Sequence, residues 1–145
     1  IFASKKQSKI SISRETALNI TAEDLFIRIE GCTYIGIIIN ELLTNSFKYA
    51  WDEGGLAGSE INIKYKVKGD YLYMDYTDNG KGFSKSTAKE GLGSTLIDLL
   101  IVHQLEGEYS INAKNGYSIN MKIPLNMLLT KEKRNESNRL ETRTS

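Results

Sequence analysis

The stretch covering residues 34–50 constrains the fold most, because it is apolar along most of its length and has no glycine or proline after Gly36. Such a run predicts a largely buried helix rather than an ordinary amphipathic one. An α-helix places residues four and seven positions apart on one face. Three polar side chains follow this spacing: Glu41, Asn45 and Lys48. They form either the lining of a cleft or a solvated stripe, and this segment alone leaves both interpretations open.

A predicted β-hairpin ends at an acidic residue. Apolar and polar residues alternate over 61–67 and again over 72–76, with Gly69-Asp70 as the turn between them. Asp78 then lies where the second strand stops. A carboxylate only accepts hydrogen bonds, so it suits the exocyclic amine of adenine and disfavours the carbonyl that guanine carries there. An ordinary Asp-Asn-Gly turn is the alternative interpretation.

Glycines follow these segments at two places. Gly80 and Gly82 let the backbone adopt positive φ and approach a ligand closely. The segment Gly91-Leu92-Gly93 precedes a predicted helix over residues 95–105, and free amides at a helix N-terminus attract phosphate. Two glycines are also common in loops before helices that bind no ligand. Neither pair extends into a P-loop or a dinucleotide-binding motif, so those two kinds of nucleotide site are excluded.

As a set, these segments resemble the ATP-binding domain shared by sensor histidine kinases, type II topoisomerases, heat-shock ATPase chaperones and MutL mismatch-repair proteins, the GHKL superfamily. The resemblance is strongest to histidine kinases with short ATP lids. It extends over about residues 25–125 and is specific as a set. Five segments carry it: residues 40–50, 78–82, 91–93, 103–107 and the closing strand up to Pro124.

The resemblance implies a role for each polar residue. Asn45 would bind Mg²⁺ through its side-chain oxygen, and Lys48 would face the phosphates of ATP. Glu41 would be a helper, because a neutral histidine acceptor needs only weak base assistance. Asp78 would bind the adenine amine. The backbone around the base and the phosphates would come from Gly80, Gly82, Gly91, Leu92 and Gly93.

Two features depart from the kinase pattern. Such kinases often carry a threonine after the glycine of the last hairpin, whereas here Gly116 is followed by Tyr117 and Ser118. The predicted lid, residues 83–90, is too short for the phenylalanine-rich box that many sensor kinases have. The only histidine, His103, lies inside a predicted helix. We expect the phosphoacceptor histidine to lie instead on dimerising helices upstream of residue 1.

Composition is typical of a soluble domain: 145 residues, 40% hydrophobic and 26% charged, can bury a core. A net charge of +1 argues against nucleic-acid or direct membrane partners. The single cysteine, Cys32, is expected to be a buried thiol. We expect one domain over residues 1–129, a polar and disordered tail over 130–145, and a cytoplasmic location for a parent protein that is either soluble or membrane-anchored.

The predicted fold class is α+β: a two-layer sandwich of the Bergerat type, with a mixed, mostly antiparallel sheet and helices on one face. A second hairpin, residues 108–112 with 117–123, completes this sheet. The N-terminal part is predicted to form short strands, one of them over 25–29, while residues 13–18 are either strand or helix.

The expected function is that of the catalytic, ATP-binding domain of a two-component sensor histidine kinase. It would bind ATP or ADP with Mg²⁺ and phosphorylate a histidine on the dimerisation domain of the same kinase, which then serves a response regulator indirectly. Two alternatives remain open: a serine kinase resembling the anti-sigma-factor kinases, and a nucleotide-dependent switch module without kinase activity.

Overall fold

The computed structural model describes residues 5–11, 16–52, 57–82 and 92–129, in which six strands form one mixed sheet. The strands are β1 (Lys5–Ser11), β2 (Thr16–Glu23), β3 (Ser59–Lys68), β4 (Tyr71–Asp78), β5 (Glu108–Asn112) and β6 (Tyr117–Pro124). Their spatial order is β1-β2-β3-β4-β6-β5. Only β2 and β3 pair in parallel among these strands, and the other neighbours are antiparallel.

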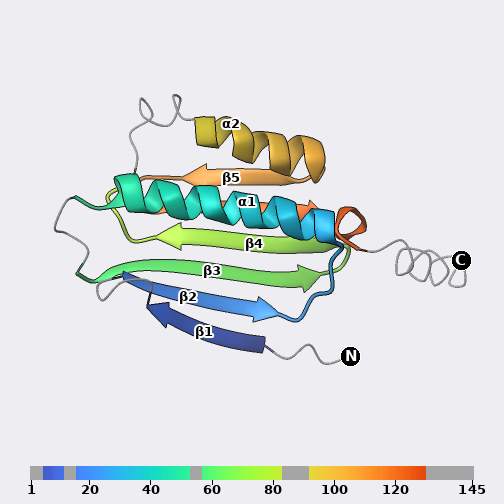
Figure 1. Ribbon diagram of the computed structural model, residues 1–145, viewed down its shortest axis with the longest axis horizontal. Helices are drawn as coiled ribbons and strands as arrows, with labels where there is room; N and C mark the ends of the chain where they lie inside the picture. The colour runs from blue at the N-terminus through green and yellow to red at the C-terminus, as the bar shows by residue number, and fades with distance from the viewer. Residues whose placement is uncertain (1–4, 12–15, 53–56, 83–91, 130–145) are drawn as a thin grey trace, which may run out of the picture.

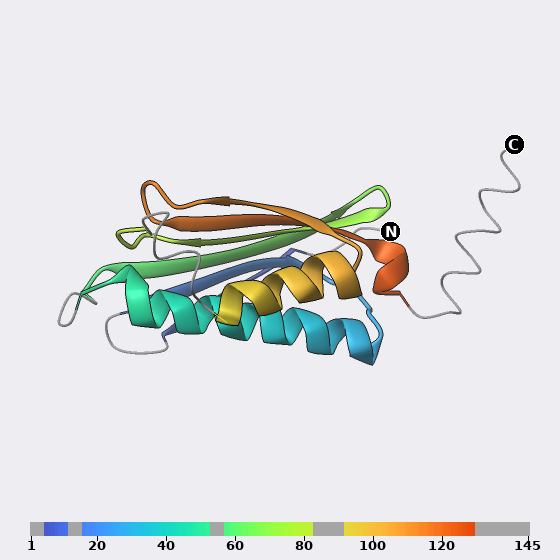
Figure 2. The ribbon, with the colours of Figure 1, turned by 90° about the horizontal axis from the view of Figure 1, so that it is seen from above.

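The helices lie on one face of this sheet (Figure 1, Figure 2). α1 (Ile29–Asn45) continues directly into a π-helical turn, η1 (Ser46–Ala50). α2 (Leu92–Asp98) continues in the same way into η2 (Leu99–Gln104), and a 3-10 turn, η3 (Leu125–Met127), follows β6. The predicted two-layer α+β sandwich is confirmed.

Both predicted hairpins are present. β3 and β4 are joined by Gly69 and Asp70, with Lys68 paired to Tyr71, and Gly69 has a φ of +59° that suits glycine. β5 pairs with β6 over the predicted residues. The register also places Asp78, the last residue of β4, opposite Ile61 on one side and Tyr117 on the other. Asp78 therefore lies at the end of a central strand, with a paired strand on each side.

The N-terminal prediction was partly wrong. Residues 25–28 form no strand, and Ile29 already begins α1, five residues before the predicted helix start. Ile29 is 78% exposed, so the alternation of Leu25, Ile27 and Ile29 does not mark one buried sheet face. Residues 16–18 belong to β2, which settles the strand or helix question for the described part of 13–18.

Helix α1 buries one stripe rather than most of its surface. Ile38, Leu42, Ser46 and Ala50 are at most 2% exposed and follow one another at steps of four residues. Ile37 is 37% exposed, so the expectation of a largely buried helix was too strong. The stripe packs on the inward residues of the central strands, which form the core: Ile61, Ile63, Leu72, Met74, Tyr76, Ile119, Met121 and Ile123.

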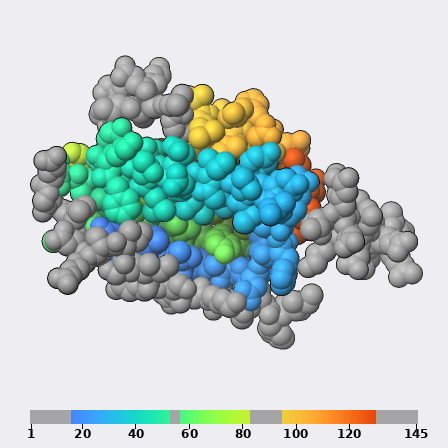
Figure 3. Space-filling model, in the orientation of Figure 1, coloured from blue at the N-terminus to red at the C-terminus, as the bar shows by residue number. Residues whose placement is uncertain are grey.

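In the space-filling view, α1 covers the middle of the sheet, and green atoms of the sheet remain visible in a hollow along its edge (Figure 3). Cys32 is exposed on α1, so the expected buried thiol was wrong. No helix in the described part of the chain is long and apolar enough to span a membrane. The predicted lid and the tail over 130–145 lie outside the described residues.

Candidate functional site

The C-terminal ends of η1 and β4 meet at one end of the domain (Figure 1). The loop that leaves β4 is fastened to both layers. The amide of Lys81 donates to the carbonyl of Ala50 at 2.8 Å, and the amide of Asn79 donates to the carbonyl of Glu60 at 3.1 Å. These bonds fix the loop over residues 79–82 between the end of the helix layer and the start of β3.

Asp78 is the centre of this region. It is 6% exposed, and three donors from separate parts of the chain contact its carboxylate. The amides of Gly80 and Tyr117 donate to Oδ1 at 3.0 and 3.1 Å, and the hydroxyl of Ser46 donates to Oδ2 at 2.5 Å. A carboxylate offers about four acceptor positions, so one on Oδ2 remains for another donor. Asp78 lies where the sequence predicted it, with a fixed orientation.

Ser46 is a site residue that the sequence analysis missed. It lies on the buried stripe of α1 and η1 and is 1% exposed. Its Oγ also lies 2.7 Å from the phenolic oxygen of Tyr76, which is 3.1 Å from the carbonyl of Leu42. A serine within an apolar helix was the available signal, because such a position needs a hydrogen-bond partner when it is buried. Its partner was not predictable from neighbouring residues.

Two tyrosines lie near Asp78. The rings of Tyr76 and Tyr117 meet edge to face with centroids 6.5 Å apart. Burial raises the pKa of Tyr117 to about 12, and Tyr109, once ionised, and the negative charge of Asp78 contribute in the same direction. Burial likewise raises the pKa of Tyr76 well above its usual value, with a further contribution from Asp78. Both phenols therefore stay protonated around Asp78 at neutral pH.

Gly80 and Gly82 are required for different reasons. Gly82 has a φ of +73°, as predicted, and a Cβ there would lie 2.1 Å from the carbonyl oxygen of Ala113. Gly80 is absent from the positive-φ residues, which contradicts the prediction for it. A Cβ at Gly80 would instead lie 2.4 Å from the Cβ of Ala50. Glycine is therefore needed at position 80 so that the loop can contact the helix layer, and not because the backbone adopts positive φ there.

Asn79 holds the rim of the site and was also missed. Its Oδ1 accepts from the amide of Glu60 at 2.8 Å and from the indole of Trp51 at 3.2 Å. Its Nδ2 donates to the carbonyl of Gly58 at 2.9 Å. The Trp51 ring lies 6.4 Å from that of Phe47. Asn79 therefore joins the loop after β4 to Trp51, directly after η1, and to Gly58 and Glu60 at the start of β3.

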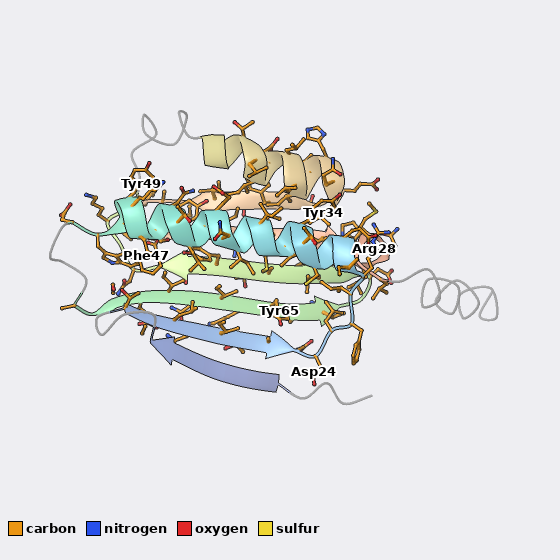
Figure 4. The ribbon with its side chains drawn as sticks, in the orientation of Figure 1. Asp24, Arg28, Tyr34, Phe47, Tyr49 and Tyr65 are labelled. Atoms are coloured by element: carbon orange, nitrogen blue, oxygen red, sulfur yellow. The ribbon has the colours of Figure 1, made fainter. Side chains whose placement is uncertain are left out.

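The three polar residues predicted to share one helix face do not all lie on α1. Glu41 and Asn45 are half-buried on α1, while Lys48 is exposed in η1. The wider π-helical turn begins immediately after Asn45, so Lys48 departs from the position that a continuing α-helix would give it. Figure 4 shows the neighbouring Phe47 and Tyr49 on opposite sides of this end of the helix.

Asn45 fits the requirements of a magnesium ligand. Among the described residues, no group of three or more histidine, cysteine or acidic side chains could hold a metal ion. Mg²⁺ keeps several waters and takes much of its shell from nucleotide phosphates, so one amide oxygen is sufficient. Asn45 is half-buried and is the last residue of α1, directly before Ser46.

The glycine segment before the second helix is described only in part. α2 begins at Leu92, so Leu92 and Gly93 belong to the helix itself rather than preceding it, and Gly91 lies outside the described residues. His103 is exposed in η2, among the buried Leu100, Ile101 and Leu105. η2 lies at the opposite end of the domain from the C-terminal end of β4 (Figure 1), so His103 is not beside Asp78 and Ser46.

Residues 33–127 of the chain match the family described as histidine kinase-, DNA gyrase B- and HSP90-like ATPases. The match extends over more than half of the 145 residues. The chain belongs to this family. It is accordingly a domain of the GHKL ATPase superfamily, as the resemblance predicted. No curated protein has a significantly similar sequence.

Solved structures of histidine kinases share this ATPase fold. The histidine kinase domain of the blue-light activated kinase EL346 from Erythrobacter litoralis has a TM-score of 0.69 and 22% identity over 79% of this chain and 54% of that one. AdeS from Acinetobacter baumannii has a TM-score of 0.56 and 18% identity over 77% and 54% of the two chains. The present chain thus spans about half the length of each of these two structures.

Proposed function

We propose that this chain is the catalytic domain of a two-component sensor histidine kinase, which binds Mg·ATP and phosphorylates a histidine on a dimerisation domain. The observation that carries the proposal is the carboxylate of Asp78, buried and oriented at the end of β4 beside η1. Its Oδ2 keeps one acceptor position after the contact with Ser46. An adenine amine can donate to that position, whereas a guanine carbonyl would face it with a second acceptor.

The helix layer supports the other end of the nucleotide in this proposal. Asn45 would hold Mg²⁺, whose charge offsets that of the phosphates when it is bound. Lys48 is exposed at η1, and its flexible side chain can reach phosphate oxygens without a fixed partner. Glu41, one α-helical turn before Asn45, is half-buried and would assist removal of the acceptor's proton.

The proposed chemistry is a single displacement at phosphorus. A nitrogen of the acceptor imidazole forms a bond to the γ-phosphorus while the bond from that phosphorus to the bridging oxygen of ADP breaks. Positioning contributes most of the rate in such a step, because a neutral imidazole is already nucleophilic. The chain therefore needs to supply orientation and charge compensation rather than a covalent intermediate.

Phosphate transfer in trans tests this function. The chain alone should not label itself with phosphate from ATP, because its only histidine, His103, is exposed in η2 and not beside Asp78. Adding a separately expressed acceptor domain from the same parent protein should give acid-labile histidine phosphate on that domain. Labelling of serine instead would favour the anti-sigma-factor-like alternative. Acid-labile labelling of the chain alone, lost in His103→Gln, would contradict the proposal.

The same assay separates the roles of the helix residues. Asn45→Ala should abolish transfer, because it removes the proposed metal ligand, while Glu41→Gln should only slow it. Asn120→Ala is the matched control, since Asn120 is exposed on β6 and bonds to Asp75 instead. A Glu41→Gln variant without transfer but with normal ADP binding would show that Glu41 is essential rather than a helper.

A further inference from the structure

We propose that Ser46 is a positioning residue for base recognition: it orients Asp78 for the adenine amine and is itself held by Tyr76. This inference rests on the proposed nucleotide-binding function. The Ser46 hydroxyl is the shortest of the contacts to the Asp78 carboxylate, 2.5 Å against 3.0 and 3.1 Å for the two backbone amides. It is also the one contact that reaches Oδ2, the oxygen with an acceptor position left.

The direction of the hydrogen bonds follows from which groups can donate. Asp78 as a carboxylate only accepts, so the Ser46 proton must point to Oδ2. The Leu42 carbonyl also only accepts, so the single Tyr76 proton is shared between that oxygen at 3.1 Å and the Ser46 oxygen at 2.7 Å. The chain therefore runs from Tyr76 to Ser46 to Asp78. Each bond in such a chain polarises the next one.

Both oxygens of Asp78 are thus fixed from different sides. The amides of Gly80, in the loop after β4, and of Tyr117, on β6, hold Oδ1, and Ser46 on the helix layer holds Oδ2. A carboxylate held at both oxygens cannot rotate about its last bond without losing a contact. The remaining acceptor position on Oδ2 therefore has a defined direction, which is what recognition of one amine requires.

Ser46 can be tested without disturbing the packing. It lies on the buried stripe with Ile38, Leu42 and Ala50, where an alanine fits the same space. Ser46→Ala consequently removes one hydroxyl and little else. Thr33 supplies a matched control on the same helix, because its hydroxyl bonds only locally to the carbonyl of Ile29 and is exposed.

The decisive experiment compares two nucleotides that differ only by the amine. Calorimetry would measure the Kd of Mg·ADP and of Mg·purine riboside diphosphate, which lacks the 6-amino group, for each variant. Ser46→Ala should weaken ADP binding about three- to tenfold and leave the analogue within about twofold. Tyr76→Phe should have a smaller effect of the same sign, and Thr33→Ala should change neither Kd. Ser46→Thr, which keeps the hydroxyl, should restore the preference.

The outcomes are separable. Equal weakening of both nucleotides, or an unchanged preference for ADP in Ser46→Ala, would overturn the role of Ser46 alone. Failure of the unmodified chain to bind either nucleotide would contradict the proposed function and this inference together. If Ser46→Ala does not fold by circular dichroism, Tyr76→Phe decides, because it leaves Ser46 in place. An unchanged ratio of the two Kd values in Tyr76→Phe would then count against the proposal.

Discussion

At the scale of single residues, the site depends on buried polar groups that hold one another by hydrogen bonds. Asp78, Ser46 and Tyr76 lie at most 6% exposed, and each has a partner contributed by another element. Removing one member leaves an unpaired buried group, which costs about 1–3 kcal/mol. The partners of Ser46 and Asn79 could not be found from the sequence, because they lie 32 and 19 residues away in the chain. Asp78 could be found, because a strand pattern ends at it.

The buried phenol of Tyr117 predicts a specific alkaline transition. Its pKa is raised to about 12 in the folded chain, and a tyrosine in the unfolded chain titrates near about 10. The Tyr117 phenol therefore loses its proton at lower pH in the unfolded chain than in the folded chain. Its full contribution to the free energy of unfolding is present below pH ~10 and is lost as the pH rises to about 12. The expected loss is roughly 2–3 kcal/mol in the free energy of unfolding.

Urea unfolding between about pH 9 and pH 12 measures this loss. Tyr117→Phe keeps the ring and the backbone amide that Asp78 uses, so it removes only the ionisable group. Its free energy of unfolding should fall less over this range than that of the unmodified chain. Identical pH dependence of the two proteins would contradict the burial argument for Tyr117.

At the scale of elements, the sequence predicted best where the relevant contacts are local. Both hairpins were confirmed because alternation and a short turn specify them together. The start of α1 was missed because the alternation over 25–29 imitates a strand, although Ile29 is exposed. The π-helical turn η1 has no sequence signature, yet it determines where Lys48 lies relative to Asn45.

The contact between the β4 loop and η1 gives a second prediction, on stability. Gly80→Ala should destabilise the chain by about 1–3 kcal/mol, because the new Cβ would overlap three atoms of Ala50. Gly36→Ala is the matched control: the new methyl group meets nothing within 4 Å on α1. That variant should be about 0.5–1 kcal/mol more stable, because alanine favours the helix.

Denaturant unfolding of the two glycine variants at neutral pH measures both effects. The two variants should change the free energy of unfolding in opposite directions, because a methyl group has room at position 36 and overlaps Ala50 at position 80. A Gly80→Ala variant as stable as the unmodified chain would show that the loop can move away from Ala50. The close approach would then not be a requirement of the site.

At the scale of the whole molecule, two layers converge on one carboxylate. The sheet supplies Asp78 and the amide of Tyr117, and the helix layer supplies the hydroxyl of Ser46. The family and the two-layer architecture could be predicted from the order of the polar and glycine segments. The parallel pairing of β2 with β3 could not, because it joins residues about forty positions apart in the chain.

Nucleotide choice shows most directly whether Asp78 binds the adenine amine. Calorimetry should show Mg·ATP binding far more tightly than Mg·GTP, and Asp78→Asn should weaken ATP about ten- to more than a hundredfold. Asp75→Asn, on the same strand but bonded to Asn120 on the open face of the sheet, should leave the ATP affinity unchanged. Equal affinities for ATP and GTP in the unmodified chain, or an Asp78→Asn variant that binds ATP normally, would contradict the account.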